Sequence, residues 1–261
     1  MLLLQIRCIR EENTALGTTD WRRPPAQGYA QGPVVLRIAE SERPQLVVQL
    51  GAGDAINALE AAQLVADRVA AVDLNMGCPM EFSTSGGMGS ALLRAPDTAA
   101  DILQTLRRNL SVPITCKIRL LSSTAETVEL ARRLEACGVA AVAVHCREVQ
   151  QRSRTPARWD ELRPLVDALN VPVVANGDVV CFDDFEKVRA ETGCHSVMAA
   201  RGALWNCSIF RSEGFADLHT EVIPRYTALA ARWSCSGINS TRVVNDMRAA
   251  GRRGRVRRTQ Q

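Results

Sequence analysis

Long hydrophobic runs are absent from this chain of 261 residues, and no stretch approaches the roughly 20 apolar residues of a membrane-spanning helix. The opening letters, MLLLQI, form a run that is too short and wrongly flanked for a secretory signal peptide. Low-complexity segments are absent too. These absences exclude the membrane-spanning and secreted classes, and we expect a protein of the cytoplasm.

Paired and clustered cysteines are also absent. The nine cysteines are scattered, with no CxxC pair and no Cys/His group spaced as a zinc site requires. An odd, dispersed set is typical of reduced thiols, so we expect no metal. The net charge is only +4, and much of the excess is a run of arginines in residues 252–258. Such a run is typical of a disordered, solvated tail that helps to attract RNA or DNA.

Short apolar runs alternate with amphipathic stretches from about residue 43 to about residue 210. The runs predict strands at 45–50, 70–75, 113–118, 141–146, 172–177 and 196–201. Apolar residues at three- and four-residue spacing predict helices at 55–69, 97–110, 125–138 and 159–170. Six βα units without a change of rhythm favour an α/β fold of the (β/α)₈ TIM-barrel type.

The first βα unit of such a barrel has no counterpart in the sequence. Residues 1–42 contain two possible strands, QIRCIR and PVVLRI, separated by a turn-rich segment without a helical period. We therefore expect a barrel domain over 1–212, with 1–42 as its irregular and incomplete beginning. Residues 213–261 are expected to hold a truncated helical domain, with one helix at 219–236 before order dissolves into the basic tail.

The segment 73–93, DLNMGCPMEFSTSGGMGSALL, joins a predicted strand to a glycine-rich loop. Cys78 lies at the junction, between Gly77 and Pro79, and glycines and hydroxyls follow it. In α/β folds the carboxyl ends of parallel strands face the ligand, so a thiol at this point is a candidate acid or nucleophile. A buried, inert cysteine is the alternative for an isolated thiol, but the glycine-rich context favours the functional interpretation.

Polar residues gather at the end of each predicted strand, and His145 is expected in register with Lys117 and Asn176. A cation inside an apolar strand carries a large desolvation cost unless a polar or anionic partner meets it. The loops after the last two strands of such barrels frequently bind phosphate through glycine amides. NGD at 176–178 and ARG at 200–202 stand there, so we expect a phosphorylated cofactor.

Six segments occur in order over roughly residues 30–212: DLNMGCP, STSGGMGSALL, TCKIR, VHCR, ANGD and AARGALWN. Together they resemble the tRNA-dihydrouridine synthase family, in particular its eukaryotic cytosolic branch that acts on position 20 of tRNA. The resemblance implies a (β/α)₈ barrel with a helical domain beside it. It also implies FMN and NADPH as cofactors, tRNA as partner, and reduction of the C5–C6 double bond of a uridine as the reaction.

Transferred position by position, the resemblance makes Cys78 the general acid and places Asn75 and Arg119 near the uracil. It assigns FMN contacts to Gln49, Lys117, His145, Asn176, Gly177, Asp178, Ala200 and Arg201. Reduced flavin would deliver hydride to C6, and a thiol, mostly protonated at neutral pH, would give its proton to C5. Positive charge on Lys117 or Arg119 would stabilise negative charge on the flavin or uracil carbonyls.

Three features depart from the family pattern. No strand with an Ala-Pro-Met turn is found in residues 1–42, Cys146 stands at the glycine of VHGR, which the resemblance places near the cofactor, and we expect no double-stranded RNA-binding domain. Two other functions stay open. One is a small-molecule pyrimidine oxidoreductase of the same barrel class. The other is a catalytically silent, truncated relative that binds RNA or protein.

Overall fold

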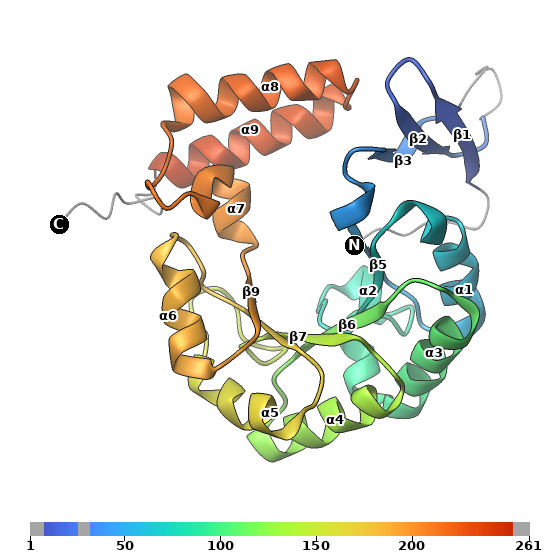
Figure 1. Ribbon diagram of the computed structural model, residues 1–261, viewed down its shortest axis with the longest axis vertical. Coiled ribbons are helices and arrows are strands. Elements are labelled where there is room, and N and C mark those ends of the chain that lie inside the picture. Colours follow the sequence, from blue (N-terminus) through green and yellow to red (C-terminus); the bar gives the residue numbers. More distant parts are fainter. Residues whose placement is uncertain (1–7, 26–31, 253–261) are drawn as a thin grey trace.

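Six parallel strands in sequential order form a strongly curved sheet at the centre of the molecule (Figure 1). The computed structural model describes residues 8–25 and 32–252. The strands are β4 (Val47–Leu50), β5 (Ala71–Asn75), β6 (Ile114–Arg119), β7 (Ala141–His145), β8 (Val173–Asn176) and β9 (Ser196–Met198). All six strands predicted from the apolar runs are confirmed. The sheet is an open half-barrel, because β4 and β9 are edges and no described strand joins them.

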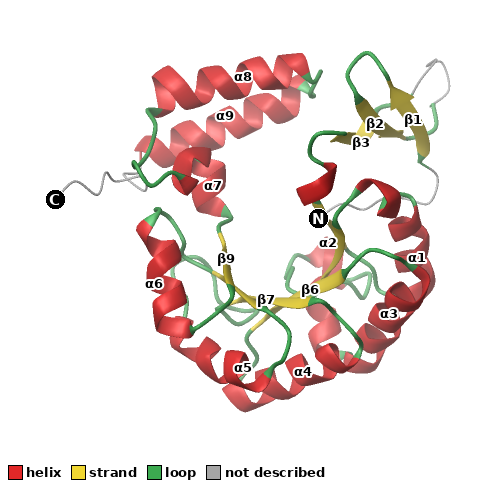
Figure 2. Cartoon of the chain, viewed as in Figure 1, coloured by secondary structure: helices red, strands yellow, loops and turns green. Residues whose placement is uncertain are grey.

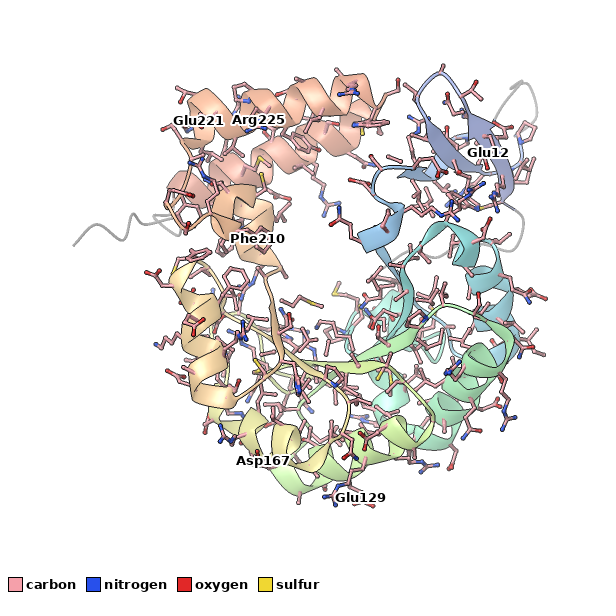
Figure 3. The ribbon with its side chains drawn as sticks, viewed as in Figure 1. Glu12, Glu129, Asp167, Phe210, Glu221 and Arg225 are labelled. Carbon is pink, nitrogen blue, oxygen red and sulfur yellow. The ribbon has the colours of Figure 1, made fainter. Side chains whose placement is uncertain are left out.

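Helices cover the outer, convex side of this sheet (Figure 2). They are α1 (Ala55–Gln63), α3 (Pro96–Asn109), α4 (Thr124–Ala136), α5 (Arg163–Ala168) and α6 (Asp183–Thr192). The four predicted helices are confirmed, and α6 is an addition. Side chains that cap helix N-termini fix two of the starts, since Asp54 accepts from Asn57 N and Ser123 from Glu126 N. Charged side chains such as Glu129 and Asp167 point outward from this layer (Figure 3).

An antiparallel sheet of three strands precedes the half-barrel, where the sequence predicted an irregular segment. Its strands are β1 (Ile9–Asn13), β2 (Thr18–Arg22) and β3 (Val34–Ala39), in the order β1-β2-β3. The two possible strands, QIRCIR and PVVLRI, are confirmed over their described residues as parts of β1 and β3, whereas β2 was not predicted. Trp21 anchors the sheet to the barrel because its buried indole donates a hydrogen bond to Leu64 O at 3.0 Å.

The C-terminal part contains more helix than the sequence predicted. After α7 (Arg201–Trp205), a π-helical turn at Leu218–Val222 leads into α8 (Ile223–Arg232), and α9 (Gly237–Arg252) packs beside α8. The expectation that order dissolves after residue 236 is therefore wrong up to residue 252. The rest of the predicted basic tail, 253–261, lies outside the described residues.

A polar contact joins the small antiparallel sheet to the C-terminal helices. Arg37 on β3 donates to Trp233 O at 2.5 Å and to Ser234 O at 3.3 Å, just after α8. The guanidinium is held by Asp20, which is 1 % exposed and accepts from two nitrogens of Arg37. The small sheet and the α8–α9 pair thus meet across the side on which the half-barrel is open (Figure 1).

Candidate functional site

The pleat of the strands brings the polar side chains to the concave face of the half-barrel in three rows. Gln49, Asp73 and Thr115 are register partners across β4, β5 and β6. Asn75 pairs with Lys117 in the next row. Nearest the strand ends, Arg119, His145 and Asn176 form the third row. His145 is thus in register with Asn176, as predicted, but with Arg119 rather than Lys117.

The loop that carries Cys78 is held to the strand ends by side chains on both sides. Asn75 Oδ1 accepts hydrogen bonds from the backbone N–H groups of Gly77 at 3.1 Å and Cys78 at 2.9 Å. Arg119 Nε donates to Gly77 O at 2.7 Å, and Arg119 Nη1 donates to Glu148 O at 3.0 Å. Cys78 itself is half-buried. The predicted substrate-binding residues therefore lie beside the predicted acid.

Glycine is required where the loop turns back against Cys78. Gly89 has φ +61°, and an added Cβ would lie 2.5 Å from Ser83 Oγ and 2.6 Å from Cys78 O. The 3-10 helix Gly89–Arg94 begins there, and Ser90 N donates to Cys78 O at 2.9 Å. The glycine-rich stretch thus packs its backbone directly against the cysteine rather than forming an open loop.

A cavity of about 230 Å³ opens at the ends of β6 to β9. Seven of the eight residues predicted to bind the cofactor line it, namely Lys117, His145, Asn176, Gly177, Asp178, Ala200 and Arg201. Gln49, the eighth, lies outside this lining and contacts Asn75, whose Nδ2 donates to Gln49 Oε1 at 2.6 Å. The concave face therefore holds a cavity on the side of β8 and β9 and a cysteine loop on the side of β5.

A larger groove of about 850 Å³ lies on the other side of the cysteine loop, between Pro79 and α4. Leucines of the β6–α4 loop form part of its lining, and both arginines and glutamates reach it, including Arg94 and Glu129. None of the strand-end residues predicted to bind a cofactor lines this groove. Its size alone is thus a poor guide to the chemistry, and the smaller cavity is the better candidate site.

Asp178 organises the cavity wall at the end of β8. Its carboxylate accepts from Arg147 Nη2 through both oxygens, from Arg201 Nη2 at 3.1 Å and from Ala157 N at 2.8 Å. Burial opposes ionisation, but the hydrogen bond from Arg147 and the charges of both arginines hold the pKa of Asp178 below its ordinary value. The carboxylate is therefore ionised and is already paired with both Arg147 and Arg201.

Lys117 is the least compensated cation at the site. Burial lowers its pKa to about 8, with help from the charge of Arg119, while Asp73 opposes the change. In the described part of the chain its ammonium forms no ion pair. A half-buried ammonium on a cavity wall that forms no ion pair favours an anionic or strongly hydrogen-bonding ligand.

His145 is neutral in this setting. Burial, followed by the charges of Arg119, Lys117, Arg147 and Arg201, lowers the pKa of the imidazole to about 3. Arg147 Nη1 lies 3.3 Å from His145 Nε2, and arginine can only donate, so Nε2 accepts and Nδ1 carries the proton. His145 therefore offers the site a neutral N–H donor over the whole physiological pH range.

Two buried residues of the site were not among the predicted contacts. Asp73 is 7 % exposed and accepts from Gln49 Nε2 at 2.7 Å and from Thr115 Oγ1 at 2.6 Å. Arg147 is 1 % exposed and clamps Asp178. A signal existed for both, since a charged residue within or just after an apolar strand must find a polar partner. Both belong to the segments DLNMGCP and VHCR that carried the resemblance.

Cys146 does not line this cavity, contrary to the expectation that its side chain lies near the cofactor. It is fully buried in the hydrophobic core, on the same face as Val142 and Val144. Burial raises the pKa of its thiol to about 12, so the group stays protonated and inert. The exchange of glycine for cysteine at this position therefore affects packing rather than the site.

Comparison with known proteins agrees with this arrangement. Residues 3–247 match the family described as dihydrouridine synthase (Dus). This chain belongs to the dihydrouridine synthase family. A tRNA-dihydrouridine(20) synthase (NAD(P)+) of Schizosaccharomyces pombe is 37 % identical over 212 residues, which are 78 % of this chain and 43 % of that protein. The Saccharomyces cerevisiae protein of the same description is 38 % identical over 193 residues, covering 71 % of this chain and 50 % of the relative.

A tRNA-dihydrouridine(20a/20b) synthase-like protein of Mus musculus is 34 % identical over 168 residues, 63 % of this chain and 52 % of its own length. This dihydrouridine synthase chain thus spans about half the length of the curated relatives that it matches. No helix among the described residues is long and apolar enough to cross a membrane. The same residues contain no group of three or more His, Cys, Asp or Glu side chains able to hold a metal ion.

Proposed function

We propose that this chain carries the catalytic half-barrel of a tRNA-dihydrouridine synthase, which reduces the C5–C6 double bond of a uridine in tRNA. The observation that supports this most directly is the position of Cys78. Its loop is fixed by Asn75 and Arg119 at the carboxyl ends of the strands, and Lys117 and His145 line the cavity at the same end. We call this end of the half-barrel the mouth. The mouth therefore combines a proton donor with a polar cofactor site, as a two-step reduction of a ring double bond requires.

The cavity residues fit FMN in two respects. Gly177 has φ +130°, and a Cβ there would lie 2.9 Å from Ala157 Cβ, so only glycine lets the backbone turn along the cavity wall at this point. Lys117, Arg201 and neutral His145 supply hydrogen-bond donors at the cavity. At about 230 Å³ the cavity is smaller than the roughly 300 to 1,000 Å³ of typical ligand sites. The cavity residues would therefore hold only part of the cofactor.

When bound and reduced, FMN supplies the hydride for C6 of the uracil ring. The protein's task is then at C5, where the Cys78 thiol gives its proton to the enolate carbon. Asn75 and Arg119 fix the backbone of the loop, so the sulfur is held in place without a conformational search. The guanidinium of Arg119 also adds positive charge beside the uracil carbonyls, where it stabilises the developing negative charge.

The finer assignments rest on the relatives' descriptions. Two of them are named for position 20 of tRNA and for NAD(P)+, and this supports U20 as target and NADPH as the source of electrons. A uridine inside folded tRNA has to leave its stack to reach the mouth. We therefore expect the flanking tRNA to bind on the rim, where the C-terminal helices contact the small sheet.

The decisive experiment is an absorbance spectrum followed by an assay with unmodified tRNA and NADPH. Bound FMN and formation of dihydrouridine, measured by mass spectrometry, are the expected results. Cys78→Ala should abolish turnover and keep the flavin, whereas Cys181→Ala, which changes another half-buried cysteine, should retain both. A colourless protein that binds RNA would favour the non-catalytic alternative. Reduction of free uracil or orotate without RNA would favour a small-molecule oxidoreductase.

A further inference from the structure

Asp73 is a buried carboxylate to which the reaction described above gives no task. It lies in the middle of the innermost polar row, between Gln49 on β4 and Thr115 on β6. Burial raises the pKa of the carboxyl group, and hydrogen bonds from Thr115 and Gln49 oppose this change. A carboxylate is costly at such a position unless its neighbours donate hydrogen bonds to it.

The contacts form a chain that ends on the cysteine loop. Gln49 Nε2 donates to Asp73 Oδ2 at 2.7 Å, and Asn75 Nδ2 donates to Gln49 Oε1 at 2.6 Å. Asn75 Oδ1 then accepts from the N–H groups of Gly77 and Cys78. Two side chains, Gln49 and Asn75, thus connect the buried carboxylate with the backbone of the proposed acid.

Each side-chain amide in this series of hydrogen bonds can take only one orientation, which its neighbour determines. Because an ionised carboxylate only accepts, Gln49 must turn its NH₂ toward Asp73 and its oxygen toward Asn75. Asn75 must then turn its NH₂ toward Gln49 and its oxygen toward the loop, where it meets two N–H groups. Without an acceptor at position 73, Gln49 could rotate by half a turn, and Asn75 could follow it away from the loop.

We propose that Asp73 is a positioning residue that fixes the Cys78 loop through Gln49 and Asn75. Its importance for turnover rests on the proposed function, but the mechanical link does not. The link requires an acceptor at position 73 rather than a charge. In Asp73→Asn the new amide oxygen can accept from Gln49 Nε2, while its NH₂ donates to Thr115 Oγ1, since a hydroxyl group can reverse its role. Asp73→Ala offers no acceptor.

Amide hydrogen exchange at Gly77 and Cys78 measures the link directly in the full chain, without substrate. Asp73→Ala should accelerate exchange at both amides about tenfold, as expected for losing one buried hydrogen bond. Asp73→Asn should restore rates near those of the wild-type chain. Thr115→Val is the matched control, because it removes the other hydrogen-bond partner of Asp73 and leaves the hydrogen bonds from Asp73 through Gln49 to Asn75 intact. The exchange rates of both loop amides should therefore stay unchanged.

A double-mutant cycle separates the link from a general loosening of the sheet. In an Asn75→Ala background the loop amides have lost their acceptor, so adding Asp73→Ala should change their exchange less than about twofold. Equal acceleration in both backgrounds would overturn the proposal, as would equal acceleration in Asp73→Asn and Asp73→Ala. If Asp73→Ala does not fold, Gln49→Leu interrupts the same chain and should give the same acceleration, and unchanged rates would again overturn the link.

This test is independent of the proposed function. Confirmed coupling in a protein that forms no dihydrouridine would count against the reaction alone. Dihydrouridine formation together with unchanged loop exchange in Asp73→Ala and Gln49→Leu would count against the link alone. In an active protein, Asp73→Ala should lower kcat while FMN occupancy is retained, and Asp73→Asn should restore kcat.

Discussion

Replacing Lys117 by methionine should strengthen the fold and weaken the binding of FMN. Burial lowers the pKa of Lys117 from 10.5 to about 8, so the folded state is penalised for holding this ammonium. At about 1.4 kcal/mol per pKa unit, the penalty at pH 7 is about 3 kcal/mol at most. Methionine has a similar shape and removes the charge, so most of this amount should return as stability of the chain without cofactor.

The pH dependence isolates the electrostatic part of this effect. Between pH 8 and 10.5 the unfolded wild-type chain still binds the lysine proton and the folded chain releases it. The stability of the wild-type chain therefore rises with pH across this window relative to that of Lys117→Met. The variant's advantage should be largest at and below pH 7 and should fade toward pH 10. Differences in packing between the two side chains would not follow this pH profile.

Urea unfolding at pH 7, 8, 9 and 10 measures the effect, and Lys187→Met is the control. Lys187 is the other lysine of the chain; its side chain is 60 % exposed and pairs with Glu191. Its replacement should change stability by less than about 1 kcal/mol. FMN titration should show at least about tenfold weaker binding for Lys117→Met alone. A stability advantage that is equal at pH 7 and 10, or full FMN occupancy in Lys117→Met, would refute the reasoning.

Three further predictions have defined outcomes, and the first has Gly17→Ala as its control. Gly89→Ala should destabilise the Cys78 loop and abolish turnover, because its Cβ would meet backbone and hydroxyl oxygens within 2.6 Å. Gly17→Ala, with a similar φ of +65° and nothing within 4 Å, should cost only about 1 kcal/mol in thermal unfolding. His145→Asn should reduce the loss of stability between pH 6.5 and about 3, since wild-type folding is opposed there by imidazole protonation in the unfolded chain. Arg37→Ala should destabilise by about 3 kcal/mol in urea, because it removes from the buried Asp20 carboxylate its closest cation and leaves only the longer contact with Arg22 at 3.9 Å, and Arg37→Ala with Asp20→Asn should recover part of that loss.

The strands of the half-barrel were predictable because their residues are apolar on the side that packs against helices. Strand β2 was not, since its sequence, TTDWR, contains no apolar run. Thr18, Thr19 and Asp20 are nevertheless buried, and Asp20 is paired with Arg37. Helix α6 was missed for a related reason: it carries three acidic residues in its first turn and buries only Val188 and Thr192. Pairing between distant polar groups leaves no periodic signal in the sequence.

The residues of the site were predictable as a set, but their mutual contacts were not. Strand ends and the family resemblance together located seven of the nine residues that line the cavity. Which of them share a row depends on the register of the strands. Strand β7 is shifted by two residues along β6 relative to the prediction, so Ala143 pairs with Lys117, and His145 pairs with Arg119. Asp73 was overlooked because the resemblance was used to assign residues that contact a ligand. Asp73 instead contacts one of those residues, since it accepts a hydrogen bond from Gln49.

The alternation of the strands explains why chemistry and core occupy the same short segments. On β6, Thr115, Lys117 and Arg119 face the concave side, while Cys116 and Ile118 between them are fully buried. A substitution in the first set should therefore change the chemistry of the concave face, whereas a substitution in the second set should disturb the packing of the core. Cys146 illustrates the second case, because it is fully buried in the core although its neighbour His145 lines the cavity. The two-residue spacing of the family's segments is thus a consequence of the pleat.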